Sequence, residues 1–156
     1  HRDLHSFPTR RSSDLIPEEG EISLPISSCR EESVIKIKMR IFFPGLESRT
    51  RYRVTRRVGP YCLLEVSPLS GRKHQIRLHL ASAGHPIVGD PIYRENGLPF
   101  LWNYYLQRSY YKPGLFEGLG LHAYQVRFQH PITGDILALE APLPETWQKW
   151  TGRDIF

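Results

Sequence analysis

The sequence has few cysteines, no long apolar run and no repeat, and these absences narrow what the chain can be. Its two cysteines, Cys29 and Cys62, form no CxxC motif and cannot frame a disulfide scaffold, so we expect a reduced, cytoplasmic chain. No apolar run approaches the roughly 18 residues that a membrane span needs. No secretory hydrophobic region and no low-complexity array appears either.

The length and composition fit one globular domain with a modest excess of positive charge. The 156 residues are 40% hydrophobic and 12% aromatic, which is enough for a core and too rich for a disordered chain. Lys and Arg number 21 against 16 Asp and Glu, a formal net charge of +5. That balance permits a polyanionic partner such as nucleic acid without demonstrating one.

The first fifteen residues, HRDLHSFPTRRSSDL, differ in character from the rest. They show neither helical periodicity nor strand alternation. The segment resembles the conceptual translation of sequencing-adapter DNA joined to a gene fragment. We therefore expect residues 1–15 to be a non-native, disordered tail, and residues 16–156 to carry the fold. A genuine basic arm that touches RNA is the alternative.

Alternation of apolar and polar residues predicts a strand-rich fold with a central helix. Strands are predicted at 19–26, 33–43, 48–57, 61–69, 120–131 and 136–144. The third and fourth, and the fifth and sixth, are expected to form hairpins. Residues 94–119, rich in aromatic side chains, are predicted to be a packed loop rather than a base-stacking surface, and 144–150 a short helix. The fold class is α+β, a mainly antiparallel mixed sheet around a central helix.

One face of the strand predicted at 48–57 carries four arginines: Arg49, Arg51, Arg53 and Arg57. Neighbours on such a face lie about 6.6 Å apart at the usual strand rise. A row of this kind suits contact with successive phosphates. The alternative is a solvated face whose arginines pair with Glu65 or Glu47 across the sheet.

The segment SGRKHQIRLHLASAGHPIVGD, residues 70–90, combines core residues with many cationic and hydrogen-bonding groups. It predicts a helix over 70–84 with Ser70 as N-cap and Gly84 at the C-terminal end. The buried stripe of this helix is Ile76, Leu80 and Ala83. In its first turn, Arg72, Lys73 and His74 would favour an anion. On its flank, Arg77 could pair with a carboxylate or phosphate, or form a structural salt bridge.

Other chemistries fit this segment poorly. His74 and His79 are five residues apart and do not share a helix face, so we predict no metal site. The run Gly71-Arg72-Lys73 is too short for a phosphate-binding loop. Ser70, His74 and Asp90 could in principle form a catalytic triad, but no nucleophile elbow accompanies them.

The sequence LSGRKHQIRLHLASAGHPIVGDPIY closely resembles the signature of the RluA-like RNA pseudouridine synthases, in which Ser70 replaces the usual threonine. The stretch GLHAYQVRFQHPITGDILALEAPLP is similar to the C-terminal hairpin of the same family. EGEISLPI and RTRYRV resemble its intermediate strands. The resemblance covers roughly residues 19–150 and implies a pseudouridine synthase fold, of which residues 16–156 would be the C-terminal part of the catalytic domain.

The resemblance implies an enzyme that converts uridine in ribosomal or transfer RNA to pseudouridine, without metal or cofactor, on a base flipped out of the RNA. Arg77 matches the family arginine that ion-pairs with the nucleophilic aspartate. Leu121 matches an aliphatic residue near the uracil, and Gln75 is expected to line the pocket. The residues expected to contact substrate or RNA are Arg72, Lys73, His74, Gln75, Leu121, Arg49, Arg51 and Arg53.

The family's nucleophile lies in an HRLD motif that this sequence does not contain. HRDL at residues 1–4 has another letter order and lies in the excluded tail, so we do not accept Asp3. We interpret Asp90 as a turn residue. We therefore expect an N-terminally truncated, inactive fragment in which Arg77 lacks a carboxylate partner and the sheet leaves apolar faces exposed.

Two other functional classes remain open. A non-catalytic RNA-binding module would use Arg77 and the arginine row for phosphate contact. A hydrolase would be built on His74, His85 and Asp90 and would depend on metal or histidine. In each case we expect a monomer that does not associate with membranes.

Overall fold

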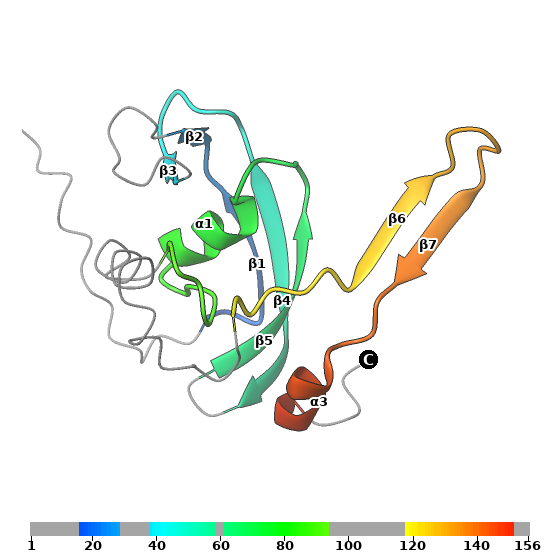
Figure 1. The fold of residues 1–156 in the computed structure, drawn as a ribbon. Coiled ribbons are helices and arrows are strands. Elements are labelled where there is room, and N and C mark those ends of the chain that lie inside the picture. The colour runs from blue at the N-terminus through cyan, green and yellow to red at the C-terminus, as the bar shows by residue number, and fades with distance from the viewer. Residues whose placement is uncertain (1–15, 29–37, 59–60, 94–117, 152–156) are drawn as a thin grey trace, which may run out of the picture.

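The computed structural model describes residues 16–28, 38–58, 61–93 and 118–151. Strands β1 (Glu19–Ser23), β4 (Arg49–Val58) and β5 (Tyr61–Pro68) form a three-stranded sheet in the order β1-β4-β5. Two further pairs join β2 (Ile26–Ser28) to β3 (Met39–Ile41) and β6 (Gln125–Gln129) to β7 (Ile136–Glu140). Every strand pairing in these residues is antiparallel. With helices α1 (Gln75–Ser82) and α3 (Glu145–Thr151), this confirms the α+β class (Figure 1).

The strand predicted at 19–26 is two strands with different partners. Its first part pairs with β4, and from Ile26 onward the chain pairs with β3 and with Leu46. The change of partner falls at Pro25, which has no N–H to donate to a ladder. Of the strand predicted at 33–43, only its later part falls in the described residues, as β3. The predicted tail, and residues 94–117 of the aromatic loop, lie outside them.

Helix α1 lies on one face of the three-stranded sheet (Figure 1). It contributes to two apolar clusters. Leu80 packs with Ile16 and Ile22, and the partly buried residues around them come mostly from β4 and β5. On its other side, Leu78 packs with Ile26, Ile92 and Tyr93. Full burial of a leucine contributes about 1.5–3 kcal/mol, so these contacts anchor the helix firmly.

The helix is shorter than the sequence predicted, and its N-cap is not Ser70. His74 occupies this position with φ of 55°, a left-handed conformation that stops the helix from extending toward the N-terminus. The predicted first-turn position of Arg72, Lys73 and His74 is therefore wrong. The predicted C-terminus is confirmed, because Gly84 has φ of 85° and its N–H donates to the Ala81 carbonyl. Ala83 is exposed rather than part of the buried stripe.

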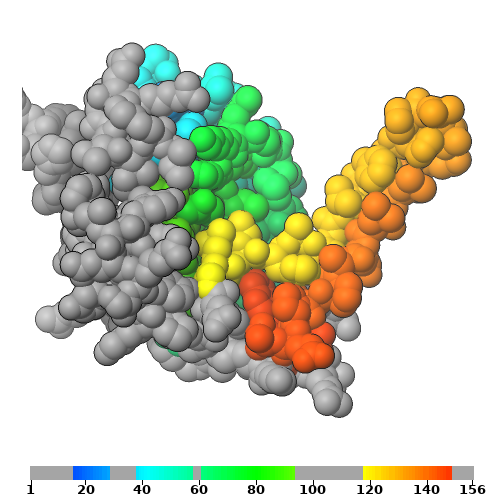
Figure 2. Space-filling view, in the orientation of Figure 1, coloured from blue at the N-terminus to red at the C-terminus, as the bar shows by residue number. Residues whose placement is uncertain are grey.

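The β6–β7 hairpin extends away from the rest of the molecule, as Figures 1 and 2 show. Its register places Val126 opposite Leu139 and Phe128 opposite Leu137, so one face is wholly apolar. Val126, Phe128 and Leu139 are exposed. The expectation of an exposed apolar face is confirmed at this hairpin.

Candidate active site

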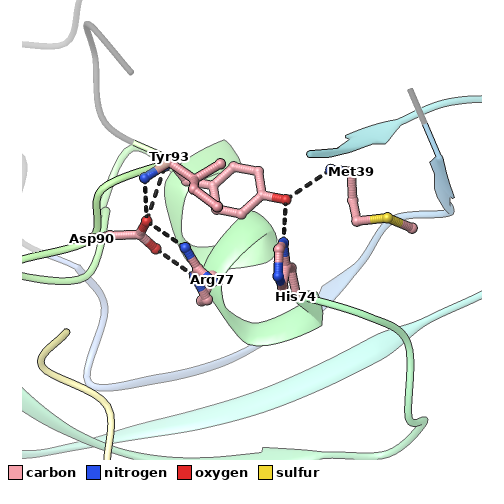
Figure 3. A network of polar contacts seen from close by, with 6 residues as sticks. Met39, His74, Arg77, Asp90 and Tyr93 are labelled. Carbon is pink, nitrogen blue, oxygen red and sulfur yellow. Dashed lines mark hydrogen bonds and ion pairs between the residues drawn. The ribbon is translucent and has the colours of Figure 1, made fainter. Parts of the chain in front are cut away.

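Arg77 and Asp90 form a two-bonded ion pair at the centre of the site (Figure 3). The Arg77 Nε donates to Asp90 Oδ2 at 2.9 Å, and Nη2 donates to Oδ1 at 2.8 Å. The Asp90 side chain is fully buried and that of Arg77 is 14% exposed. The expectation that Arg77 lacks a carboxylate partner in this chain is therefore wrong. Hydrogen bonding to Asp90 raises the pKa of Arg77, so the guanidinium is always charged.

Asp90 is held by a tight turn as well as by the arginine. Its Oδ1 accepts hydrogen bonds from the backbone N–H groups of Ile92 and Tyr93. Burial alone would raise the pKa of this carboxyl, but the hydrogen bonds from Arg77, Ile92 and Tyr93 outweigh burial and lower it. A buried carboxylate with both oxygens bonded is poorly suited to attack a substrate. The position of Asp90 thus fits the turn role expected from the sequence rather than that of a nucleophile.

The turn before Asp90 requires glycine. Gly89 has φ of 74°, and an added Cβ would overlap the carbonyl of Gly118. The N–H of Gly120 donates to the Val88 carbonyl at 2.7 Å. This pairing brings residues 118–121, including the exposed Leu121, beside the turn that carries Asp90.

Tyr93 links the ion pair to His74. The Arg77 guanidinium lies 5.2 Å from the centre of the Tyr93 ring, a cation–π contact. The tyrosine oxygen accepts a hydrogen bond from the Met39 N–H at 2.8 Å and lies 2.9 Å from His74 Nδ1 (Figure 3). Burial, together with the charges of Arg77 and Lys73, lowers the pKa of His74. The imidazole is therefore neutral at pH 7, and one of its two ring nitrogens is free to accept a hydrogen bond.

Gln75 is a buried amide whose hydrogen-bonding capacity is fully used within the chain. Its Oε1 accepts from Ser70 Oγ and from the Arg72 N–H, while its Nε2 donates to the Arg49 carbonyl and to Thr50 Oγ1. The side chain is 3% exposed. The expectation that Gln75 lines a pocket therefore gives way to a structural role, in which it closes the loop before α1 and ties it to β4.

The other residues of this segment are less constrained. Arg72 is exposed, and its Nε donates to the Glu47 carbonyl at 3.3 Å. Lys73 is exposed beside it. The two cations and His74 therefore lie in the loop just before α1, on the same stretch of chain as Arg77. His85 lies just after the helix, and among the described residues it does not join Asp90 in a group of three or more His, Cys, Asp or Glu side chains.

His79 was missed as a structurally important residue. Its side chain is fully buried, with Nε2 3.0 Å from the Leu24 carbonyl and Nδ1 2.9 Å from Thr50 Oγ1. A carbonyl only accepts, so Nε2 carries the proton and Nδ1 accepts from the threonine. Burial lowers the pKa of His79 more than the Leu24 bond raises it, so the ring is neutral.

Acidification from pH 7 to pH 5 should destabilise the chain through His79. A histidine whose folded pKa is below its ordinary value of 6.5 binds a proton more readily when unfolded, so stability present above pH 6.5 is lost as the pH falls. His79→Gln should lower the free energy of unfolding at pH 7 by about 1–3 kcal/mol. Between pH 7 and pH 5, however, the variant should lose less stability than the native chain does. Urea denaturation at both pH values checks this, and parallel losses in the two proteins would contradict it.

The arginine row is paired with acidic residues. Arg53 forms an ion pair with Glu65 at 2.6 Å, which confirms Glu65 as a predicted partner. Arg51 forms its ion pair with Glu21 at 2.8 Å, not with the predicted Glu47. A β-bulge between Val54 and Arg56 shifts the alternation, so the exposed fourth position is Arg56. Arg57 turns instead to Glu18 and to the Ile16 carbonyl. The placement of Arg57 in the row is therefore wrong.

Arg51→Ala should change stability by no more than about 0.5 kcal/mol, because the Arg51 side chain is 63% exposed. Arg57→Ala, which also loses a bond to a backbone carbonyl, should cost more and serves as the comparison. Urea denaturation at low and high salt measures both. If the row follows RNA phosphates, Arg51→Ala will also weaken RNA binding and reduce the salt dependence of that binding.

In the described part of the chain, no three His, Cys, Asp or Glu side chains converge as metal ligands. In the same residues, no helix is long and apolar enough to cross a membrane.

Comparison with known proteins points to one family. A family model described as RNA pseudouridylate synthase matches residues 10–82. The chain is 32% identical over 136 residues to ribosomal large subunit pseudouridine synthase D of Nitrosomonas europaea, covering 83% of this chain and 35% of that protein. It is 41% identical over 88 residues to tRNA pseudouridine synthase C of Vibrio cholerae, covering 56% and 33%.

Solved structures show the same fold. Human RNA pseudouridylate synthase domain containing 4 aligns with a TM-score of 0.54 at 28% identity, covering 82% of this chain and 53% of that one. The human domain containing 1 protein aligns with a TM-score of 0.58 at 23% identity, covering 88% and 55%. The chain spans about a third of the length of the curated relatives it matches.

Proposed function

The chain belongs to the RNA pseudouridylate synthase family, and we propose that it forms part of an enzyme that isomerises uridine to pseudouridine in ribosomal or transfer RNA. The observation that carries this proposal is Arg77, which lies on α1, is mostly buried and is held by Asp90. It occupies the position of the family signature that the sequence already indicated.

The reaction breaks the N1–C1′ bond of uridine and forms a C5–C1′ bond. The proton on C5 leaves, and N1 gains a proton, so the product has the composition of the substrate. A carboxylate nucleophile must be ionised and correctly oriented for this chemistry. The fixed charge of Arg77 would lower the pKa of a nearby carboxyl and orient it by hydrogen bonding.

The carboxylate itself is not supplied by Asp90, which is buried and fully bonded, and no HRLD motif occurs in the 156 residues. We therefore propose that the chain as given is inactive and that the nucleophile is encoded upstream of Ile16. The cations Arg72 and Lys73, neutral His74, and Leu121 remain our proposed contacts to RNA. A monomeric, cytoplasmic enzyme that needs no cofactor remains a prediction.

The test is tritium release from RNA labelled at C5 of uridine, because the reaction expels that hydrogen. The locus is sequenced upstream of the Ile16 codon, and two proteins are compared, the 156-residue chain and the chain extended by the upstream frame. We expect an in-frame HRLD motif, release by the extended protein and none by the shorter one. Release by the shorter chain would refute its inactivity.

The same two proteins, tested for RNA binding and strand cleavage as well as tritium release, separate the alternative functions. An extended protein that binds RNA but releases no tritium would favour the non-catalytic RNA-binding module. The arginine row offers little support for that alternative, because Arg51 and Arg53 are already paired with glutamates. Strand cleavage that depends on His74 or on added metal would favour the hydrolase.

A further inference from the structure

We propose that Asp90 is the positioning residue for Arg77, and that by holding the Nε–Nη2 edge of the guanidinium it presents Nη1 to a second carboxylate. This inference rests on the proposed function, in which that second carboxylate belongs to the nucleophile. It assigns Asp90 a part in the reaction that is distinct from its role in the turn.

The N–H groups of the Arg77 guanidinium fall into two sets: those that bond Asp90 and those on Nη1, which do not. Its single Nε–H and one Nη2–H go to the two oxygens of Asp90, a geometry that fixes the plane of the guanidinium. Nη1 has no hydrogen-bond partner among the described residues. The Arg77 side chain keeps 14% of its surface exposed, so it is not wholly enclosed by the chain.

Asp90 can serve as a fixed clamp because it cannot rotate freely. Its Oδ1 accepts two backbone N–H groups, and the side chain is fully buried. Rotating the carboxylate to follow a moving arginine would break these bonds and leave buried donors unpaired.

The Tyr93 ring limits the arginine from a second side. The ring lies 5.2 Å from the guanidinium carbon, and its hydroxyl is tied to Met39 and His74. The clamp therefore draws on β3, on α1 and on the turn that follows it, as Figure 3 shows.

A positioned guanidinium differs from a merely paired one in how it responds to a second anion. In Asp90→Asn, the amide oxygen can still accept the Ile92 and Tyr93 N–H groups, which preserves the turn. Its NH₂ group, however, faces the Arg77 Nε–H as donor against donor. The variant thus leaves at most the single Nη2–Oδ1 bond, which does not fix the plane of the guanidinium, while it keeps the turn.

The experiment is nitrogen NMR of the arginine side chains in the intact 156-residue chain. In the native chain we expect separate, slowly exchanging Nη1 and Nη2 signals for Arg77, with added acetate shifting Nη1 and leaving Nε and Nη2 nearly unmoved. Asp90→Asn should merge the two Nη signals and abolish this selectivity while its backbone spectrum remains native. Asp135→Asn, at an exposed turn carboxylate, is the matched control and should behave as the native chain.

Several outcomes would overturn the proposal. Averaged Nη signals in the native chain would do so, as would equal acetate shifts on Nε and Nη1, or an unchanged pattern in Asp90→Asn. The acetate titration uses the native chain and so decides the matter even if the variant fails to fold. A second titration replaces acetate with inorganic phosphate at equal ionic strength. If the Nη1 signal shifts at a lower phosphate concentration than acetate concentration, a carboxylate partner is refuted. None of these measurements requires RNA. A failure of the Asp90 proposal can therefore be distinguished from a failure of the proposed function, which the tritium assay tests.

Discussion

Arg77→Met is expected to lower the free energy of unfolding by about 3–5 kcal/mol, the usual cost of removing one partner from a buried ion pair. The reason is Asp90, which would remain fully buried with two backbone hydrogen bonds and no opposing charge. Methionine keeps most of the side-chain volume, so little of the loss reflects packing. Urea denaturation at pH 7 measures it.

The control for this prediction is the double variant Arg77→Met with Asp90→Asn. It removes both charges and keeps an acceptor for the turn, so it should recover much of the lost stability. Acid provides a second check. Because the folded pKa of Asp90 is below its ordinary value of 3.8, its contribution is present above that pH and is lost as the pH falls through the folded pKa. The difference between native chain and Arg77→Met should therefore shrink in strong acid, and a constant difference would contradict the assignment.

Gln75→Leu is expected to cost about 3 kcal/mol or more. It removes four hydrogen bonds, each worth about 0.5–1.5 kcal/mol. The Arg49 carbonyl keeps the Leu69 N–H and Thr50 Oγ1 keeps His79, whereas the Arg72 N–H loses its Gln75 acceptor. The loop before α1 should loosen at the same time, which hydrogen exchange of the Arg72 and Gln75 amides would detect.

The matched control is Gln125→Leu, the same substitution on the exposed β6. Gln125 makes one exposed hydrogen bond, to Glu140, and its replacement should change stability by no more than about 0.5 kcal/mol. If Gln75→Leu cost as little as Gln125→Leu in the same denaturation experiment, the structural role of Gln75 would be refuted.

Much of the fold could be predicted from the sequence because local patterns decide it. Alternation located β4, β5, β6 and β7, and the turn residues between them predicted both hairpins. Gly84 marked the end of α1, since a left-handed residue is needed there. The start of α1 was predicted wrongly because the helical pattern of residues 70–84 continues through His74, whose left-handed backbone is supported by contacts distant in sequence, such as that with Tyr93.

Of the candidate site, too, the sequence predicted one part and only the tertiary structure decided the rest. The resemblance of residues 69–93 to a family signature indicated the family and singled out Arg77, because that signature is visible in the order of the letters. Which carboxylate Arg77 would meet, the inward turn of Arg57 and the buried amide of Gln75 were decided only by the tertiary structure. Periodicity fixes the face on which a residue lies, whereas its partner across 13 or more residues depends on how a turn, a bulge and a helix pack together.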